Sequence, residues 1–346
     1  MLQSRKLPRI TTLGVLILAA LSMPLVGGSQ NAPMKKIRVS LSDVSINKIP
    51  FLVAENEGLY KKYGLDVTMT PFSAGAARVH GVPDETPRSV RDAVVNPDIS
   101  IGGGAPGMVD KATSSEPNDR VIIGTTDHIV HWDVVAKKGI TSIQQLKGKR
   151  FAISSPAACT GVVARVLAEH LGWDPDQDMA ILEGNYSVTP LEKDWADALI
   201  AYEVPLAAAM KAGYKPLEDV DMRSWNEPIA CNGIWSSKSW AHANKDTVIA
   251  YLKAVTEAIS MMKKDKEVAF RAIARYYKIN DREQQQVIYN GAEEMPRKPY
   301  PAVDGIKRTM ELFNTAAMRR FKPEDFYDDS FMKELDESGF IDNLYK

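Results

Sequence analysis

The sequence predicts an α/β protein with two doubly wound lobes, each built on a mixed, mainly parallel sheet. Two observations lead to this class. The chain has 346 residues, more than one ordinary core holds but suited to two lobes of roughly 100–150 residues. Strand-like apolar segments also alternate with helical segments along most of the chain, and this order is typical of parallel sheets covered by helices on both faces.

The composition is that of a soluble globular protein. Hydrophobic residues make up 45% of the chain and charged residues 25%, which is an ordinary balance. The formal net charge is -1, so the chain lacks the basic excess that binding to nucleic acid or to an anionic membrane requires. We therefore expect no nucleic-acid partner.

Residues 1–28 predict a cleavable secretory signal peptide. Three basic residues precede an uncharged apolar run, which ends in small residues near Gly28. A membrane anchor is the alternative, but a spanning helix needs about 20 apolar residues and this run is interrupted by polar residues and Pro24. No cysteine follows the run, so we expect no lipid anchor. The predicted location is the periplasm.

The first third of the mature chain alternates strands with helices and then breaks this pattern. We expect strands at 37–41, 65–69, 99–101 and 121–123, and helices from Pro50 to Gly64 and from near Pro106. Residues 73–97 are rich in Gly, Pro, Arg and Asp, which predicts a loop with a short helix around 89–94.

Residues 132–229 form a second alternating region, and a helical region follows it. We expect strands at 132–136, 151–153, 180–182, 198–200 and near Leu217, with helices at 142–148, 160–171 and 205–212. An extended connector at 229–236 leads to helices at 245–263, 266–277, 282–290 and 303–319, and to a short helix after Asp325.

Ligands of parallel α/β sheets bind outside the carboxyl ends of the strands, where helices begin. That rule selects the loops after Leu41, Ile101, Ile153 and Ile200. The candidate ligand-binding residues in these loops are Ser42, Asn47, Gly104, Ala105, Ser154, Ser155, Cys159, Thr160, Tyr202 and Glu203.

The loop before the helix at Thr160 has the chemistry of a ligand contact. Free N–H groups at a helix start attract electron-rich groups, and the hydroxyls of Ser154, Ser155 and Thr160 add donors. Ordinary N-capping is the alternative use of these hydroxyls. The glycines at 102–104 offer close backbone approach, but no Gly-Lys-Ser/Thr follows them, which excludes a nucleotide P-loop.

The other two loops bear on the nature of the solute. Asp43 would disfavour a dianion if it faces the site, although a solvated turn is the alternative for that loop. Tyr202 and Glu203 offer a ring for stacking and a carboxyl that accepts hydrogen bonds. No arginine lies in the four loops, so a bidentate oxyanion clamp is unsupported. We therefore expect a neutral or weakly charged solute, aromatic or heterocyclic in type.

Signals for catalysis, metals and disulfides are weak. No hydrolase, zincin or Cys-His-Asn signature is found, so we expect neither a catalytic site nor a cofactor. His128 and His131 are three apart in an extended stretch and would face opposite sides, so no metal site is expected. Export would permit a disulfide between Cys159 and Cys231, but we expect two unlinked buried thiols.

The order of short motifs resembles that of the periplasmic solute-binding proteins for nitrate, sulfonates, taurine and thiamine-precursor pyrimidines. The resemblance covers the chain from about Ile37 to about Ser260. Its motifs are the strand, polar loop and Pro-initiated helix of residues 37–57, the stretch Gly58-Leu59-Tyr60 through Gly64-Leu65-Asp66-Val67, Asp98-Ile99, SIQQLKGKR at 142–150, Asp197-Ala198 and Glu203-Val204-Pro205.

The resemblance implies a type II periplasmic-binding fold, in which two hinge crossings join the lobes. The crossings would lie near Thr125–Trp132 and Ala230–Trp235, which adds Thr126 and Trp235 to the candidate ligand-binding residues. The implied limits are 36–128 for the first part of lobe 1, 132–229 for lobe 2, and 233–346 for the rest of lobe 1 with the C-terminal helices. Residues 76–97 depart from the family pattern, so the resemblance does not define the shape of the cleft wall in lobe 1.

The implied function is capture of a small organic solute and its delivery to the membrane permease of an ABC transporter by a monomeric protein. An enzyme on the same fold, acting on a pyrimidine-like or aromatic metabolite, is the alternative. A sensor role beside a membrane receptor is another. The leader and the low cysteine count favour the transport role over the enzymes of this fold.

Overall fold

The computed structural model describes residues 33–41, 48–71, 97–184 and 186–346. The predicted signal peptide, the loop from Ser42 to Asn47 and residues 72–96 lie outside the described residues. The predictions for Ser42, Asp43, Asn47 and the short helix at 89–94 therefore have no structural counterpart here.

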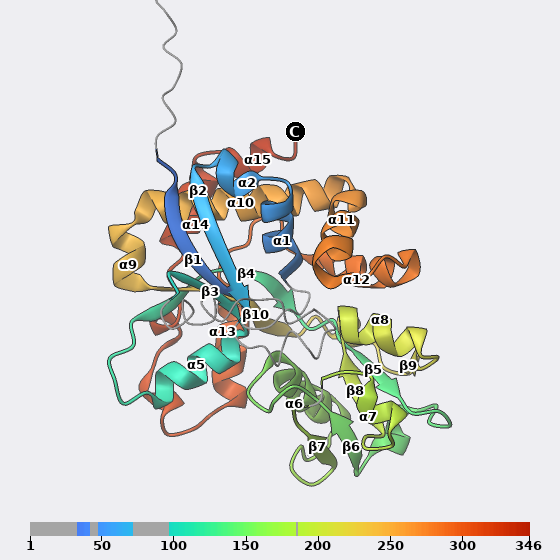
Figure 1. Cartoon of the computed structure of the whole chain (residues 1–346). Helices are drawn as coiled ribbons and strands as arrows, with labels where there is room; N and C mark the ends of the chain where they lie inside the picture. Colours follow the sequence, from blue (N-terminus) through green and yellow to red (C-terminus); the bar gives the residue numbers. More distant parts are fainter. Residues whose placement is uncertain (1–32, 42–47, 72–96, 185) are drawn as a thin grey trace, which may run out of the picture. The chain divides into compact units, whose positions relative to one another are not determined.

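Two five-stranded sheets organise the described chain (Figure 1). The first sheet has the order β2-β1-β3-β10-β4, with β1 Lys35–Leu41, β2 Leu65–Pro71, β3 Ile99–Gly102, β4 Arg120–Ile129 and β10 Pro228–Ser237. The second sheet has the order β7-β6-β8-β5-β9, with β5 Asp133–Ala136, β6 Lys149–Ala152, β7 Met179–Leu182, β8 Ala198–Ala201 and β9 Lys215–Pro216.

Both sheets are mixed and mainly parallel, as predicted. In the first sheet β10 runs antiparallel to its neighbours β3 and β4, while β1 pairs in parallel with β2 and β3. In the second sheet β5 is the antiparallel strand, between β8 and β9, and β6 pairs in parallel with β7 and β8. One strand in each sheet therefore opposes the other four.

Helices follow most of the strands and close the chain. The α-helices are α1 Ile49–Asn56, α2 Leu59–Lys62, α5 Gly104–Thr113, α6 Cys159–Leu171, α7 Thr189–Glu192, α8 Glu203–Lys211, α9 Lys238–Ala243, α10 Lys245–Lys264, α11 Lys266–Tyr277, α12 Arg282–Glu294, α13 Val303–Leu312, α14 Ser330–Glu337 and α15 Phe340–Asn343. Short 3-10 turns lie at Ile143–Leu146, Met222–Trp225, Met318–Arg320 and Pro323–Asp325.

Apolar side chains cover both faces of each sheet. On β4, Ile123 faces a core shared with α1, α10 and α11, while its neighbour Ile122 faces another core with Trp235 and α13. On β5, Val134 and Val135 enter different cores in the same way. Successive residues of a strand point to opposite faces, so each sheet is buried on both sides. The doubly wound class predicted from the sequence is confirmed.

Local signals account for several element ends. Pro50 lies in the first turn of α1, where a missing N–H costs nothing. Gly172 ends α6 in the left-handed conformation at φ 65°, which glycine adopts without strain. Tyr60 of α2 and Tyr251 of α10 stack with ring centroids 5.4 Å apart and pack these two helices together.

The predicted helix at 303–319 is wrong in its second half. Helix α13 ends at Leu312, and a separate 3-10 turn begins at Met318. The hydroxyl of Thr315 accepts a hydrogen bond from the Met318 N–H at 3.1 Å. Short polar side chains that bond the nearby backbone compete with the helix in this manner.

Strands β4 and β10 lie at the predicted crossings and are paired antiparallel, with Cys231 opposite Asp127 and Gly233 opposite Thr125. All strands of the second sheet fall between them in sequence. Contacts join Met34–Lys346 into one unit, so the lobe limits at 36–128, 132–229 and 233–346 stay a prediction.

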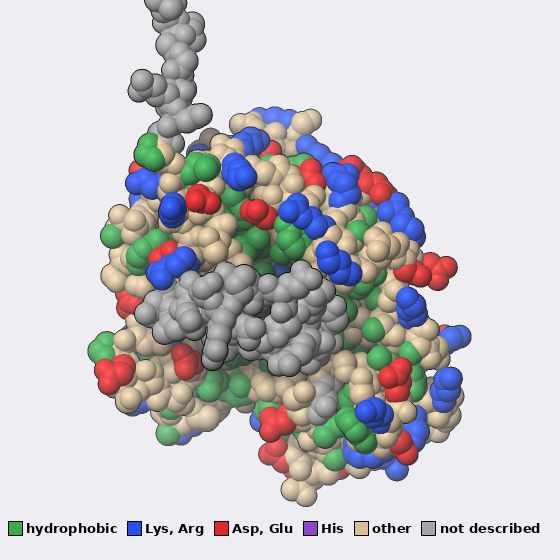
Figure 2. Space-filling view, in the orientation of Figure 1, with side chains coloured by type: hydrophobic (Ala, Val, Ile, Leu, Met, Phe, Trp, Pro, Cys, Tyr) green, Lys and Arg blue, Asp and Glu red, His purple; other side chains and the backbone are tan. Residues whose placement is uncertain are grey.

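The described surface is mixed in charge. On the face drawn in Figure 2, basic and acidic side chains are interspersed. Among the described helices, none combines the length and the apolar composition that crossing a bilayer demands.

Candidate functional site

A pocket, here called the central pocket, is lined by segments that follow strands of both sheets. Beside the first sheet, Lys48 precedes α1, Gly103 precedes α5, Pro106 lies in the first turn of α5, and Asn232 lies on β10. Three of the four loops selected from the sequence therefore border this pocket in the described chain, and Lys48 directly follows the fourth.

The second sheet supplies the rest of the lining. Ser154, Ala158, Cys159 and Thr160 follow β6, and Tyr202, Glu203 and Pro205 follow β8. Two further aromatic side chains, Trp132 before β5 and Tyr186 after β7, complete the wall. The pocket thus combines helix starts, aromatic rings, one lysine and one carboxyl.

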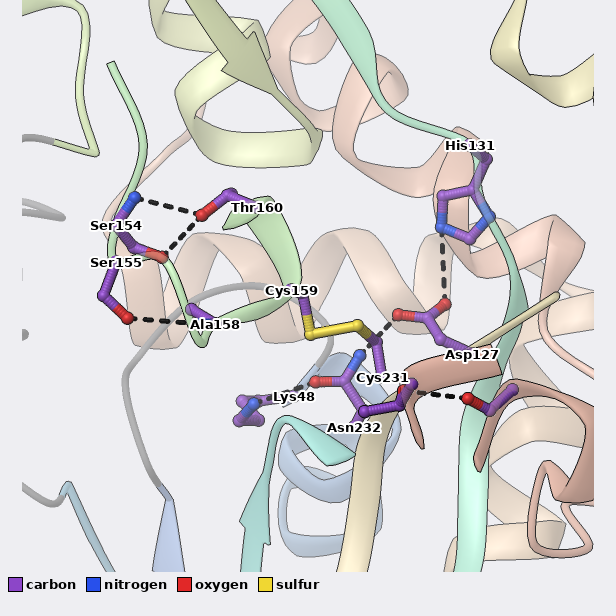
Figure 3. Close-up of a disulfide and its surroundings, with 12 residues drawn as sticks. Lys48, Asp127, His131, Ser154, Ser155, Ala158, Cys159, Thr160, Cys231 and Asn232 are labelled. Atoms are coloured by element: carbon purple, nitrogen blue, oxygen red, sulfur yellow. Dashed lines mark hydrogen bonds and ion pairs between the residues drawn. A yellow bond between two sulfur atoms is a disulfide. The ribbon is translucent and has the colours of Figure 1, made fainter. Parts of the chain in front are cut away.

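The hydroxyls after β6 bond within their own loop. Thr160 Oγ1 accepts a hydrogen bond from the Ser154 N–H at 3.0 Å and lies 2.7 Å from Ser154 Oγ. Ser155 Oγ accepts from the Ala158 N–H at 3.2 Å (Figure 3). These bonds hold the backbone that enters α6 in place, although the N-cap of α6 is Ala158 and no side chain caps this helix. Ser155 itself does not line the pocket.

Cys159 and Cys231 form a disulfide, so the expectation of two unlinked thiols is wrong (Figure 3). Their Cα atoms are 6.1 Å apart although they are separated by 72 positions in sequence. The bond joins the first residue of α6, beside the second sheet, to β10 of the first sheet. Sequence separation alone does not reveal such proximity, because it arises only when both sheets have formed.

A buried polar chain leads from the central pocket into the protein. Lys48 Nζ donates a hydrogen bond to Asn232 Oδ1 at 3.0 Å, and Asn232 Nδ2 donates to Asp127 Oδ2 at 2.5 Å. All three side chains are buried. Asn232 has φ 55°, a conformation that asparagine tolerates better than most residues. Burial of a lysine and an aspartate is costly unless they are paired, and Asn232 connects them.

His131 continues this chain beyond Asp127. Its Nε2 lies 3.4 Å from Asp127 Oδ1 (Figure 3). Its Nδ1 lies 2.9 Å from Glu294 Oε2. Burial alone would lower the pKa of His131, but the two carboxylates outweigh burial and raise the pKa to about 9. The imidazole is therefore protonated at neutral pH and stacks on Trp132 with centroids 5.0 Å apart.

Tyr202 and Glu203 are the most constrained residues of the central pocket. Glu203 begins α8 with φ 51° and is 1% exposed. Positive φ at a non-glycine residue costs energy and gathers at functional sites. Neither carboxyl oxygen of Glu203, nor the hydroxyl of Tyr202, has a satisfactory hydrogen bond within the described chain. Burial and the charge of Asp127 raise the pKa of Glu203 well above its usual range, so the carboxyl is neutral.

The neutral carboxyl has a consequence for stability. A carboxyl with a raised pKa contributes stability that is fully present below its unfolded value of 4.5 and falls as pH rises towards the folded value. Glu203→Gln removes this ionisation. We therefore expect the variant to lose less stability than the wild type between pH 5 and pH 8 in urea unfolding. Parallel curves for the two proteins would contradict a buried neutral Glu203.

Gly291 of α12 makes room for this pair. A Cβ at position 291 would lie 1.9 Å from the Tyr202 hydroxyl and 2.7 Å from Glu203 Oε1. Gly291→Ala should therefore cost about 1–3 kcal/mol of stability by overpacking, although alanine is the better helix former. Asn290→Ala, exposed on the same helix, serves as the control and should be close to neutral. Equal melting temperatures for both variants would contradict this prediction, because they would mean that the Tyr202 side chain moves away from a Cβ at position 291 without cost.

The other predicted site residues lie outside the central pocket lining. Gly104 packs against Ala230, with no room for a Cβ, and Ala105 belongs to the core around α6. Thr126 is fully buried on β4. Trp235 packs on Gly107 in the core with α13. The residues brought together at the pocket are Ser154, Cys159, Thr160, Tyr202 and Glu203.

Sequence reasoning missed Lys48 and Asn232 as lining residues. Lys48 directly follows the selected loop 42–47, so extending that loop by one residue would have included it. Asn232 lies in the predicted return crossing, where only Trp235 was chosen. The contact between His131 and Asp127 was not predicted either. The two residues are four apart, and an extended chain does not bring such residues together.

No metal site is found among the described residues. His131 is ion-paired, and the ring Nε2 of His128 lies within hydrogen-bonding distance of the backbone oxygens of Thr125 and Tyr300. Both histidines are thus engaged by protein groups.

Comparison with known proteins identifies the fold. Residues 109–269 match the family model described as NMT1/THI5 like. The periplasmic nitrate-binding protein NrtA from Synechocystis PCC 6803 superposes with a TM-score of 0.66 at 12% identity, covering 88% of this chain and 89% of that chain. The alkanesulfonate-binding protein SsuA from Xanthomonas axonopodis pv. citri gives 0.60 at 16% identity, covering 88% and 98%.

The chain therefore has the fold of the periplasmic binding proteins. The resemblance to nitrate- and sulfonate-binding proteins, drawn from the sequence motifs, is confirmed by the family model and by these structures. The same fold also occurs in an enzyme, the desulfurization enzyme DSZB, with a TM-score of 0.58 at 12% identity over 88% of this chain and 99% of that one. Comparison with curated proteins gives no significant match.

Proposed function

We propose that the chain is an extracytoplasmic solute-binding protein that captures a small organic solute in the central pocket and delivers it to an ABC-type permease. The observation that carries the proposal is the position of this pocket, at which segments following strands of both sheets meet. Ligands of α/β sheets bind at such strand ends. A solute that contacts both groups of segments favours the conformation in which they are close.

The disulfide supports the exported location. Disulfides persist in oxidising compartments such as the periplasm and are rare in the cytosol. In this proposal residues 1–28 direct export and are then removed, and the mature protein acts as a monomer in the periplasm. N-terminal sequencing of the protein from a periplasmic extract should find a start near Ser29.

A thermal-shift screen against a broad panel of small organic solutes tests the binding role. A bound solute stabilises the folded state by mass action, so at least one compound should raise the melting temperature of the wild type. Tyr186→Ala removes a half-buried ring from the pocket wall and should reduce this shift. Tyr214→Ala removes a half-buried ring that lies outside the central pocket, just before β9 of the second sheet. This variant should preserve the thermal shift.

The screen also separates transport from catalysis. A binding protein returns its solute unchanged, whereas an enzyme converts it, and mass spectrometry of the recovered solute distinguishes the two. Absence of any shift across the panel, or equal shifts in the two tyrosine variants, would contradict binding in the central pocket.

A further inference from the structure

Glu203 is a buried carboxyl in the lining of the central pocket, and its oxygens lack a well-formed hydrogen bond in the described chain. It is 1% exposed, and neither oxygen makes a satisfactory hydrogen bond in the described chain. Buried polar groups in native proteins are nearly always paired, and an exception calls for an explanation. The backbone of this residue is strained at φ 51°, and such strain gathers at functional sites. A group kept in this way at a pocket wall is suited to a partner that arrives with the solute.

The charges around Glu203 indicate the sign of that partner. Lys48 and protonated His131 are positive, Asp127 and Glu294 are negative, so these four sum to zero. Ionisation of Glu203 would leave one negative charge in excess. Lys48 does not compensate it alone, because it already donates to Asn232, which in turn bonds Asp127. A cationic group on the solute would restore neutrality.

The aromatic wall points to the same sign. Trp132 and Tyr202 lie with ring centroids 4.9 Å apart, and Tyr186 adds a third ring to the lining. Aromatic faces attract cations. By contrast, no arginine belongs to the described lining, and the hydroxyls of Ser154, Ser155 and Thr160 are engaged within their own loop.

We propose that the central pocket takes a solute with a cationic N–H group, an amine or amidine, and that Glu203 accepts its hydrogen bond. This inference rests on the proposed binding function. On binding, the neutral carboxyl loses its proton to solvent and the carboxylate pairs with the cation. One proton is released for each cation bound, and no other bond changes.

Titration calorimetry with benzamidine, benzamide and benzoate tests the proposal, since these probes share a flat ring and differ in charge. Benzamidine should bind the wild type most tightly. At neutral pH its apparent heat should differ between phosphate and Tris buffers by an amount that corresponds to release of about one proton. Glu203→Gln should weaken benzamidine binding about tenfold or more, abolish the buffer dependence and leave benzamide little affected. Glu192→Gln, exposed on α7, is the matched control and should behave as wild type.

Three results would overturn the proposal: benzoate binding as tightly as benzamidine, no measurable binding of benzamidine, or unchanged benzamidine binding in Glu203→Gln. The proposed function fails separately. If the thermal-shift screen finds an anionic solute whose effect depends on Tyr186, the chain is still a binding protein and only the assignment of a cationic solute is wrong.

Discussion

Replacing both cysteines, as Cys159→Ser with Cys231→Ser, should lower the free energy of unfolding by about 4 kcal/mol. The cross-link closes a loop of 72 positions, and in the chain-entropy account a loop of this length restricts the unfolded chain by roughly that amount. Urea unfolding of the oxidised wild type and of the double variant measures the difference.

A reductant provides the control for this prediction. The wild type unfolded with excess dithiothreitol should match the double variant, and the variant should not respond to dithiothreitol. Equal unfolding midpoints for oxidised wild type and variant would mean that the disulfide does not form in the protein. Because Cys159 lines the central pocket, the variant should also bind its solute more weakly.

Replacing His131 should change how stability depends on pH. The raised pKa of His131, about 9 against an unfolded value of 6.5, contributes about 3 kcal/mol. That contribution is fully present below pH 6.5 and is lost as pH rises through about 9. Wild-type stability should therefore fall across this window, and His131→Gln should be less stable at pH 6 with a flatter profile. Urea unfolding at several pH values measures both effects.

His242→Gln is the matched control for this profile. His242 is exposed and pairs with Asp328, away from the central pocket. Its variant should retain the wild-type fall in stability between pH 6.5 and 9. If His131→Gln retains the same fall, Asp127 and Glu294 do not hold a proton on the imidazole.

Much of the fold could be predicted because its signals are local. Alternation at Ile37, Val39 and Leu41 predicted β1, Pro50 predicted the start of α1, and Gly172 predicted the end of α6. The rule that ligands bind at strand ends then predicted Tyr202 and Glu203, which follow β8, as residues of the binding site. These inferences depend on a few neighbouring residues and on one general property of parallel sheets.

The rest depends on distant contacts. The disulfide and the path Lys48–Asn232–Asp127 join residues more than 70 positions apart, and no local pattern encodes them. Gly104 and Trp235 were predicted as ligand-binding residues but pack in the interior, because glycine near a helix start and tryptophan near a crossing also serve packing. The helix predicted over 303–319 failed for a local reason, the competing hydrogen bond between the Thr315 hydroxyl and the Met318 N–H.

A native mass spectrum of the protein, purified from the periplasm without added ligand, tests the central claim most directly. We expect a fraction of the protein to carry one small organic molecule, released on denaturation and present in a smaller fraction of the Tyr186→Ala variant. The cationic proposal adds that this molecule contains a basic nitrogen. A single species at the bare mass of the mature chain, in preparations of wild type and variant alike, would contradict the account of a solute-binding protein.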